Sequence, residues 1–221
     1  MKKRLVIFDL DGTLLNTIAD IASATNAALL KLGYPTHSDS VIQSFVGNGI
    51  GKLLERALPE DKRTEENKNI IRQHFTAHYD KHNTDLSTPY PGIEEMLFTL
   101  HKAGVMLAVA SNKYQIATEK LVSHYFPGIE FISVLGQRTG IPIKPDPEIV
   151  HEIMTKANVS KADTLYIGDS GVDMQTAHNS GIDAVAVSWG FRPREELLSY
   201  NPLAIVNHAE ELEQLILHQE D

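Results

Sequence analysis

The chain has 221 residues, a formal net charge of −9 and no cysteine. This length suits one large domain, or one domain with a smaller companion. The negative charge argues against nucleic acid or an anionic membrane surface as a partner, because both require a basic face. The lack of cysteine excludes disulfides and thiolate metal sites. Only residues 5–8 are apolar before Asp9, too few for a secretory signal, and no window suits a membrane span, so we expect a cytoplasmic protein.

The first predicted element is a strand over residues 4–9, and a long helical segment follows it. From about residue 17 to residue 88 the apolar residues recur only with helical spacing, which predicts helices near 18–32, 41–45, 50–57 and 62–82. Gly33 and Pro35 end the first of them. Residues 88–92 contain two prolines and a glycine, which indicate a rigid connector. We therefore predict a small helical domain, residues 17–88, inserted into a larger domain formed by residues 1–16 and 89–221.

Short apolar runs alternate with helical patterns in the rest of the chain. Strands are expected at 105–110, 131–135, 164–168, 184–188 and 204–206, and helices at 115–125, 147–157, 172–180 and 209–218. Nearly continuous apolar strands that alternate with helices are typical of a parallel sheet covered on both faces. The predicted fold class is therefore α/β, with a doubly wound parallel sheet. Ligands of such sheets bind beyond the carboxyl ends of the strands, near the point where the strand order reverses.

Acidic residues follow two of the predicted strands. Asp9 and Asp11 close the first strand, and Asp169 and Asp173 follow the strand at 164–168. An Asp-x-Asp pair alone is more often a solvated turn, and an EF-hand is excluded because its sixth position would be Leu14. Carboxylates that converge at one sheet edge repel one another unless a cation lies between them. Ligands that are all oxygen favour a hard ion, and Mg²⁺ fits best.

Residues suited to an anion follow two other predicted strands. Ser111, with the backbone amides after it at the start of a helix, could hold a phosphate group. Lys144 could neutralise the same anion, although alone it would be read as a surface lysine before a proline-rich turn. Lys113 could face a substrate, pair with an acid or be solvated.

These residues resemble the four motifs of the haloacid dehalogenase-like superfamily. The motifs are Asp9-Leu10-Asp11-Gly12-Thr13, Ser111, Lys144, and Gly168-Asp169-Ser170-Gly171-Val172-Asp173. The helical insertion looks like the cap that many members carry after the first strand. Its Gly47-Asn48-Gly49 turn is similar to that of phosphoglycolate phosphatases, as are Ser111-Asn112-Lys113 and Lys144-Pro145-Asp146-Pro147. Asn16 departs from the pattern, because relatives often carry an acid there, near the hinge of the cap.

The resemblance implies a phosphatase with covalent catalysis. Asp9 would attack phosphorus and form an aspartyl-phosphate, while Asp11 would protonate the leaving alcohol and then activate water. Mg²⁺ would be bound by Asp9, by the backbone carbonyl of Asp11 and by Asp169, and Asp173 would orient metal-bound waters or Lys144. The phosphate would be held by Gly12, Thr13, Ser111, Asn112 and Lys144.

The substrate is expected to be a small phosphorylated metabolite, with 2-phosphoglycolate favoured. Asn48, Lys52 and Lys113 are candidates for reading a carboxylate on its leaving group. The alternatives are a β-phosphoglucomutase-like phosphomutase, a pyrophosphatase or nucleotide phosphatase of the same subfamily, and, outside enzymes, a phosphometabolite-binding module. A dehalogenase is disfavoured, because that activity needs neither Mg²⁺ nor the second acid. The sequence is compatible with a monomer or a homodimer.

Overall fold

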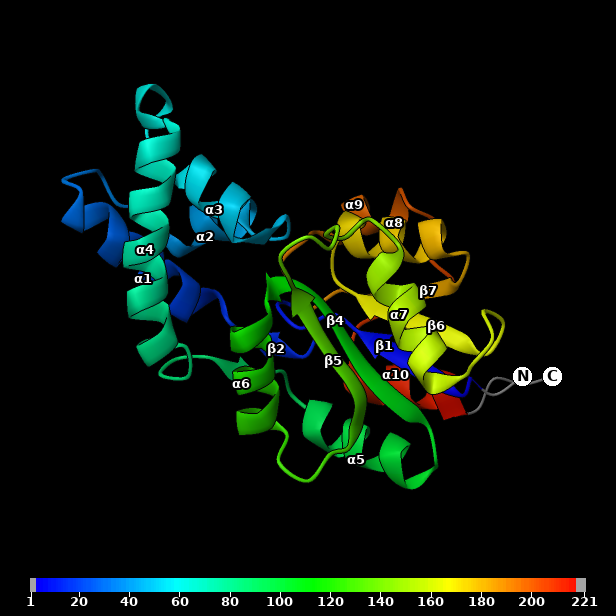
Figure 1. Ribbon diagram of the computed structural model, residues 1–221. Helices are drawn as coiled ribbons and strands as arrows, with labels where there is room; N and C mark the ends of the chain where they lie inside the picture. Colours follow the sequence, from blue (N-terminus) through cyan, green and yellow to red (C-terminus); the bar gives the residue numbers. More distant parts are fainter. Residues whose placement is uncertain (1–2, 218–221) are drawn as a thin grey trace.

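A six-stranded sheet forms the centre of the computed structural model, which describes residues 3–217 (Figure 1). Its strand order is β5-β4-β1-β6-β7-β8, and every neighbouring pair is parallel. The strands are β1 (Leu5–Phe8), β4 (Met106–Tyr114), β5 (Phe131–Gln137), β6 (Thr164–Gly168), β7 (Asp183–Val187) and β8 (Ala204–Val206). The predicted α/β fold with a parallel sheet is confirmed.

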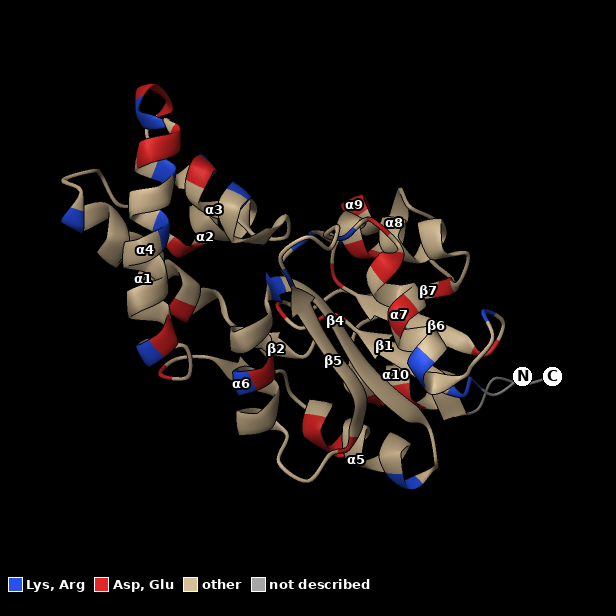
Figure 2. Cartoon of the chain, viewed as in Figure 1, with Lys and Arg blue, Asp and Glu red and all other residues tan. Residues whose placement is uncertain are grey.

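Helices cover both faces of the sheet, which explains why its strands are mainly apolar. In β1, Val6 and Phe8 pack into a cluster with α5 (Ile93–Lys102), α6 (Gln115–Tyr125) and α10 (Ala209–Leu217). Leu5 and Ile7 point to the other face, where α7 (Glu148–Ala157) and α8 (Gly171–Ser180) pack. Figure 2 shows the resulting division, with charged residues mainly on the helices and loops and the strands uncharged except near their ends, as at Lys113 in β4 and Asp183 in β7. The predicted last residue of the closing helix, residue 218, lies outside the described residues.

The order of the strands places a switch point at β1. The chain leaves β1, later adds β4 and β5 on one side of it, and then adds β6, β7 and β8 on the other side. The carboxyl ends of β1, β4 and β6 therefore border a crevice in which a ligand can bind.

The helical segment lies beyond this edge of the sheet (Figure 1). It contains α1 (Ile18–Lys31), α2 (Asp39–Phe45), α3 (Gly49–Ala57), the short 3₁₀ helix η1 (Glu60–Lys62) and α4 (Glu65–His82). We call residues 17–88 the cap segment. The chain enters this segment through β2 (Leu15–Asn16) and leaves it through β3 (Thr88–Pro89). These two strands form an antiparallel pair in which Asn16 lies opposite Thr88. Most of one hydrophobic cluster lies within the segment, and Ala117 of α6 also belongs to it; the division of the chain into two domains stays a prediction.

Some element boundaries differ from those expected. The strand predicted at 105–110 continues to Tyr114, because after a register shift Tyr114 pairs with Gln137 of β5. Helix α4 starts at Glu65 rather than near 62, since the side chain of Thr64 accepts a hydrogen bond from the amide of Asn67 and caps the helix. Helices α5 and α9 (Arg194–Leu198) were not predicted. Within residues 3–217 no helix combines the length and hydropathy needed to cross a membrane.

Candidate active site

Lys144 and Asp9 form the centre of the site. Asp9 directly follows β1, and Lys144 lies in the loop between β5 and α7. The Lys144 Nζ donates to Asp9 Oδ1 at 2.9 Å, to Asp173 Oδ1 at 2.7 Å and to the carbonyl of Ala110 at 2.9 Å. Burial lowers the pKa of Lys144, but the carboxylates of Asp173 and Asp9 outweigh it and raise that pKa well above its usual value. Lys144 is therefore a buried permanent cation beside Asp9.

Three buried carboxylates lie close together at this site. Asp9, Asp169 and Asp173 each offer an oxygen, and these oxygens lie within 4.8 Å of one another. Burial raises the pKa of Asp9 to about 7, although Lys144 opposes the shift. Burial, with the charges of Asp173 and Asp9, also raises the pKa of Asp169 well above its ordinary value. Lys144 pairs with two of the three acids, Asp9 and Asp173, and a divalent cation would relieve the negative charge that remains in excess. The all-oxygen set suits a hard ion such as Mg²⁺.

Two glycines form the slot that holds Asp169. A Cβ at Gly12 would lie 2.3 Å from Asp169 Oδ2, and one at Gly190 would lie 2.2 Å from Asp169 Cβ. Inside the slot, Asp169 accepts hydrogen bonds from Thr13 Oγ1 at 3.3 Å and from the amide of Phe191 at 2.6 Å. Gly12 and Thr13 thus lie against Asp169. Their contact with phosphate stays a prediction.

Asp173 is fixed by the first turn of α8. Its Oδ2 accepts hydrogen bonds from Ser170 Oγ at 2.6 Å and from the Ser170 amide at 3.1 Å, and the Ser170 side chain in turn accepts from the Asp173 amide. This capping box leaves Oδ1 to face Lys144. Both carboxylate oxygens are engaged, so the side chain is held in place as a partner of the lysine.

Asp11 lies on the cap side of Asp9 and has two partners. Its Oδ1 accepts from Thr17 Oγ1 at 2.6 Å, and its Oδ2 lies 3.1 Å from Lys113 Nζ. Lys113 also donates to the hydroxyl of Tyr79 in α4, at 2.9 Å. Burial lowers the pKa of Lys113, but Asp11 and then Tyr79 outweigh it and raise that pKa above its usual range. Of the three alternatives for Lys113, the structure has it buried and paired with an acid.

Ser111 and Asn112 lie in β4 rather than at the start of a helix, and that expectation was wrong because α6 begins only at Gln115. Ser111 is buried, and its Oγ accepts from the amide of Lys113 at 3.2 Å. Asn112 holds the backbone of Lys144 at both ends, since its Oδ1 accepts from the Lys144 amide at 2.9 Å and its Nδ2 donates to the Lys144 carbonyl at 3.0 Å. The extended end of β4 thus positions Lys144.

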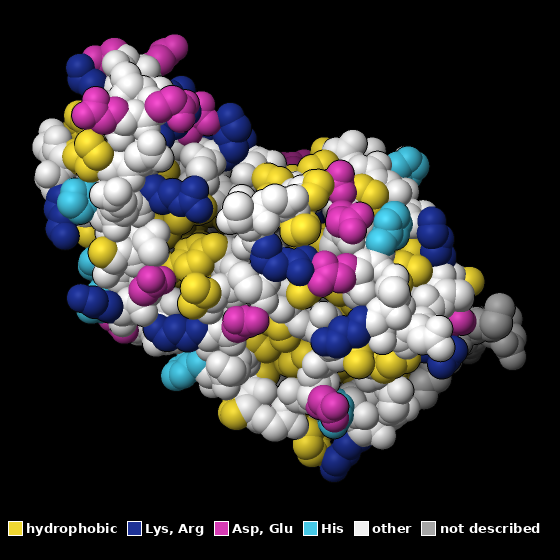
Figure 3. Space-filling view, viewed as in Figure 1, with side chains coloured by type: hydrophobic (Ala, Val, Ile, Leu, Met, Phe, Trp, Pro, Cys, Tyr) yellow, Lys and Arg dark blue, Asp and Glu magenta, His cyan; other side chains and the backbone are white. Residues whose placement is uncertain are grey.

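The cap segment closes a small cavity over these groups, of about 60 Å³. The surface is hollowed where the two parts meet (Figure 3). The residues that line the cavity from the cap side are mainly apolar: Ile21, Val46, Ile50, Leu53, Phe75 and Tyr79. Two predicted substrate residues do not line it: Asn48 Oδ1 accepts from Arg56, and Lys52, with 59% of its side chain exposed, pairs with Glu55.

Residues 189–192 border the site. From the sequence, the position of Trp189, Gly190 and Phe191 after the fifth predicted strand fitted either a place beside the site or packing in the core, and Arg192 was assigned no role. Trp189 Nε1 donates to the carbonyl of Thr13 at 3.0 Å, and the Phe191 amide binds Asp169. Arg192 lines the cavity. The available indication was position: this stretch follows β7, at the same edge of the sheet as the other site residues.

Comparison with known proteins agrees with this geometry. A family model for haloacid dehalogenase-like hydrolases matches residues 6–187. A phosphoglycolate phosphatase from Pseudomonas fluorescens is 33% identical over 210 residues, which cover 93% of this chain and 76% of that protein. One from Vibrio parahaemolyticus is 31% identical, with 96% of each chain covered. The crystal structure of a provisionally named phosphoglycolate phosphatase from Lactobacillus delbrueckii subsp. bulgaricus has a TM-score of 0.92 and 35% identity, and covers 99% of this chain and 100% of that one. The chain belongs to the haloacid dehalogenase-like hydrolase family.

Proposed function

We propose that this protein is a Mg²⁺-dependent phosphatase that hydrolyses 2-phosphoglycolate through an aspartyl-phosphate on Asp9. The observation that carries the proposal is the buried Lys144, which contacts the Asp9 carboxylate at 2.9 Å in a cavity that three acids share. A phosphoryl dianion needs such a fixed cation beside its nucleophile, because catalysis of phosphoryl transfer is mainly positioning and charge stabilisation.

In the first step, an Asp9 oxygen forms a bond to phosphorus while the bond from phosphorus to the ester oxygen breaks. Asp11 gives its proton to the departing alkoxide. In the second step, Asp11 takes a proton from water, the water oxygen bonds to phosphorus and the bond to Asp9 breaks, which releases phosphate. Thr17 and Lys113 hold the Asp11 carboxylate on the leaving-group side for both transfers.

The remaining residues bind and orient. Asp9, Asp169 and the backbone carbonyl of Asp11 would hold Mg²⁺, which supplies charge neutralisation for the phosphoryl oxygens when bound. Ser111 and the amide of Asn112 would bind another phosphoryl oxygen. Gly12 and Thr13 would contribute from the loop after β1, where they already pack on Asp169.

The cavity supports a small substrate. A volume of about 60 Å³ accommodates a few waters, since one water needs about 10–15 Å³ by this measure. A nucleotide would not fit under the cap segment in this arrangement. Lys113 lines the cavity and would attract a carboxylate on the leaving group, as glycolate carries. Asn48 and Lys52 could take part only after a rearrangement of α3, because neither lines the cavity here.

The test is a kinetic screen in the presence of Mg²⁺ over 2-phosphoglycolate, sugar phosphates, nucleotides and pyrophosphate, with release of phosphate as the readout. We expect the largest kcat/KM for 2-phosphoglycolate and no turnover by the Asp9→Asn variant, purified in the same way as a control. Isomerisation of β-glucose 1-phosphate without release of phosphate would refute the hydrolase and establish the mutase.

A further inference from the structure

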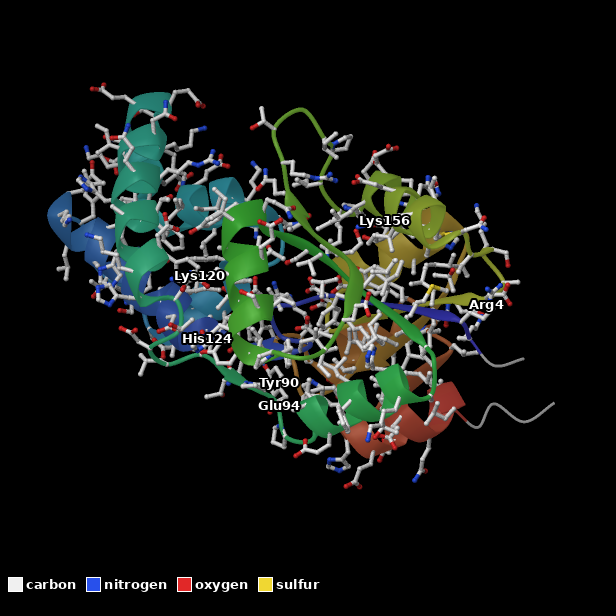
Figure 4. All side chains as sticks on the ribbon, turned by 60° about the horizontal axis from the view of Figure 1, so that its bottom comes forward. Arg4, Tyr90, Glu94, Lys120, His124 and Lys156 are labelled. Atoms are coloured by element: carbon white, nitrogen blue, oxygen red, sulfur yellow. The ribbon has the colours of Figure 1, made fainter. Side chains whose placement is uncertain are left out.

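Two groups of hydrogen bonds connect the cap segment to the larger domain, and each group is called a line here. On one line, Tyr114 Oη donates to Asp80 Oδ1 at 2.5 Å and Lys120 Nζ donates to the carbonyl of Asp80 at 2.7 Å. Figure 4 labels Lys120, a residue of α6 whose side chain reaches α4. On the other line, Arg192 and Asn112 bind the turn between α2 and α3. Arg192 has no assigned role, although it lies on the second line beside the candidate site.

Across the interface, the partners of Arg192 are carbonyls at the carboxyl end of α2, while its Nε lies 4.0 Å from Glu196 Oε1 on its own side. Its Nη1 donates to the carbonyl of Gln43 at 3.1 Å and its Nη2 to the carbonyl of Val46 at 2.5 Å. In return, Gln43 Nε2 donates to the carbonyl of Phe191 at 3.0 Å. The last carbonyls of a helix lack partners within the helix, and the negative end of its dipole favours a cation. Only 18% of the Arg192 side chain is exposed, so these bonds are partly shielded from water.

Arg56 offers a matched comparison at the same helix end. Its Nη1 donates to the carbonyl of Phe45 at 2.9 Å, and its Nη2 donates to Asn48 Oδ1 at 2.9 Å. Arg56 belongs to α3, so both of its bonds stay within the cap segment. The bonds of Arg192 cross to the larger domain, and they must break when the cap segment moves away. The two arginines cap one helix, but only Arg192 ties it to the rest of the protein.

The stretch that carries Arg192 also touches the candidate metal ligand. The Phe191 amide donates to Asp169 Oδ2 at 2.6 Å, and Gly190 packs its backbone against the Asp169 side chain. A change in the position of this carboxylate therefore reaches Arg192 through one intervening residue.

We propose that Arg192 is a positioning residue that latches the cap segment over the site, and that residues 190–192 couple the position of Asp169 to closure. The role in catalysis rests on the proposed function, whereas the latch can be tested without a substrate. Charge-assisted hydrogen bonds from Arg192 favour the closed arrangement, but water replaces them in the open one, so their net contribution is modest. We expect their loss to raise the open fraction about tenfold.

Hydrogen–deuterium exchange of the full chain tests the latch in Arg192→Ala, Arg192→Lys and the control Arg56→Ala. The reporter is the backbone of residues 110–114, which belongs to the larger domain and lies under the turn between α2 and α3. We expect exchange there to be about tenfold faster in Arg192→Ala and intermediate in Arg192→Lys. Arg56→Ala should exchange at the wild-type rate at 110–114, and we expect faster exchange only at 43–48, where the bonds of Arg56 are lost. The latch would be overturned if residues 110–114 exchange in Arg192→Ala at the rate seen in the wild type. It would also be overturned if exchange at 110–114 is accelerated as much in Arg56→Ala as in Arg192→Ala.

A second arm adds Mg²⁺ without substrate. In the wild type we expect Mg²⁺ to slow exchange at 43–48, and this protection should be lost in Arg192→Ala. Equal protection in the two proteins would overturn the coupling.

In kinetics, Arg192→Ala should raise KM about tenfold with a smaller change in kcat, because the closed state is reached less often. A wild-type protein that releases no phosphate would refute the proposed function and leave the exchange comparison intact.

Discussion

The slot around Asp169 provides a sharp perturbation, the Gly190→Ala substitution. A Cβ at this position would lie 2.2 Å from Asp169 Cβ, whereas ordinary contacts begin at 3.4 Å. The two carbons would be about 1.2 Å too close, so Asp169 or the backbone at residue 190 must move by about that distance. The obstructing atom is a Cβ fixed to the backbone, so a change of rotamer cannot remove the clash.

The displacement should act on metal binding more than on the fold. Overpacking of this kind costs about 1–3 kcal/mol, less than the stability of a typical domain. Changes next to a metal ligand commonly lower affinity about 10–100-fold. A displacement of about 1 Å at a reacting centre can cost about 100-fold in rate. We therefore expect a folded Gly190→Ala protein with Mg²⁺ affinity at least tenfold weaker and kcat/KM at least a hundredfold lower.

The assay is calorimetric titration with Mg²⁺, combined with release of phosphate at saturating Mg²⁺. Gly51→Ala is the control, because Gly51 lies in α3 with no atom within 4 Å of an added Cβ. This change should stabilise the helix by about 0.5–1 kcal/mol and leave Mg²⁺ binding unaltered. A Gly190→Ala protein that binds Mg²⁺ as tightly as the wild type would refute the assignment of Asp169 as a ligand.

Three other predictions concern the charged residues. Without metal, the pKa of Asp9 is raised from 3.8 to about 7, so the stability that this carboxyl contributes is present below pH 3.8 and is lost as the pH rises through 7. Urea unfolding in EDTA should show this loss of stability, and the Asp9→Asn variant should lack that pH dependence. Lys144→Met leaves Asp9 and Asp173 buried without their cation, and should cost about 3–5 kcal/mol in urea unfolding; a loss below about 1 kcal/mol would contradict the burial argument. Asp11→Asn should keep Mg²⁺ binding within about twofold but slow both steps by about 100-fold or more in single-turnover kinetics, and an unchanged rate would exclude Asp11 as the proton carrier.

Much of the site could be predicted because a parallel sheet brings the carboxyl ends of its strands together. Asp9 and Asp169 follow the neighbouring strands β1 and β6, so strand order alone makes them neighbours. The length of β4 could not be predicted, since it depends on pairing with β5 through Tyr114. Its extension changed the location of Ser111 from a helix start to a strand, without moving it away from the site.

Residues whose role depends on distant side chains were harder to predict. Lys113 meets Tyr79 across 34 positions of sequence, and Arg192 meets Val46 across 146. The direction in which Asn48 and Lys52 point depends on how α3 packs, and local periodicity does not contain that information. In each case the chemistry of the residue was visible, but its partner was fixed only by tertiary packing.

In the proposed reaction, Asp9 carries the phosphoryl group during turnover. Acid quenching of the Mg²⁺-loaded enzyme during steady-state hydrolysis of 2-phosphoglycolate, followed by peptide mass spectrometry, tests it directly. We expect one phosphoryl group on the peptide that contains Asp9, absent without Mg²⁺ and absent in Asp9→Asn. Turnover by Asp9→Asn at the wild-type rate, or phosphorylation at another residue, would contradict it.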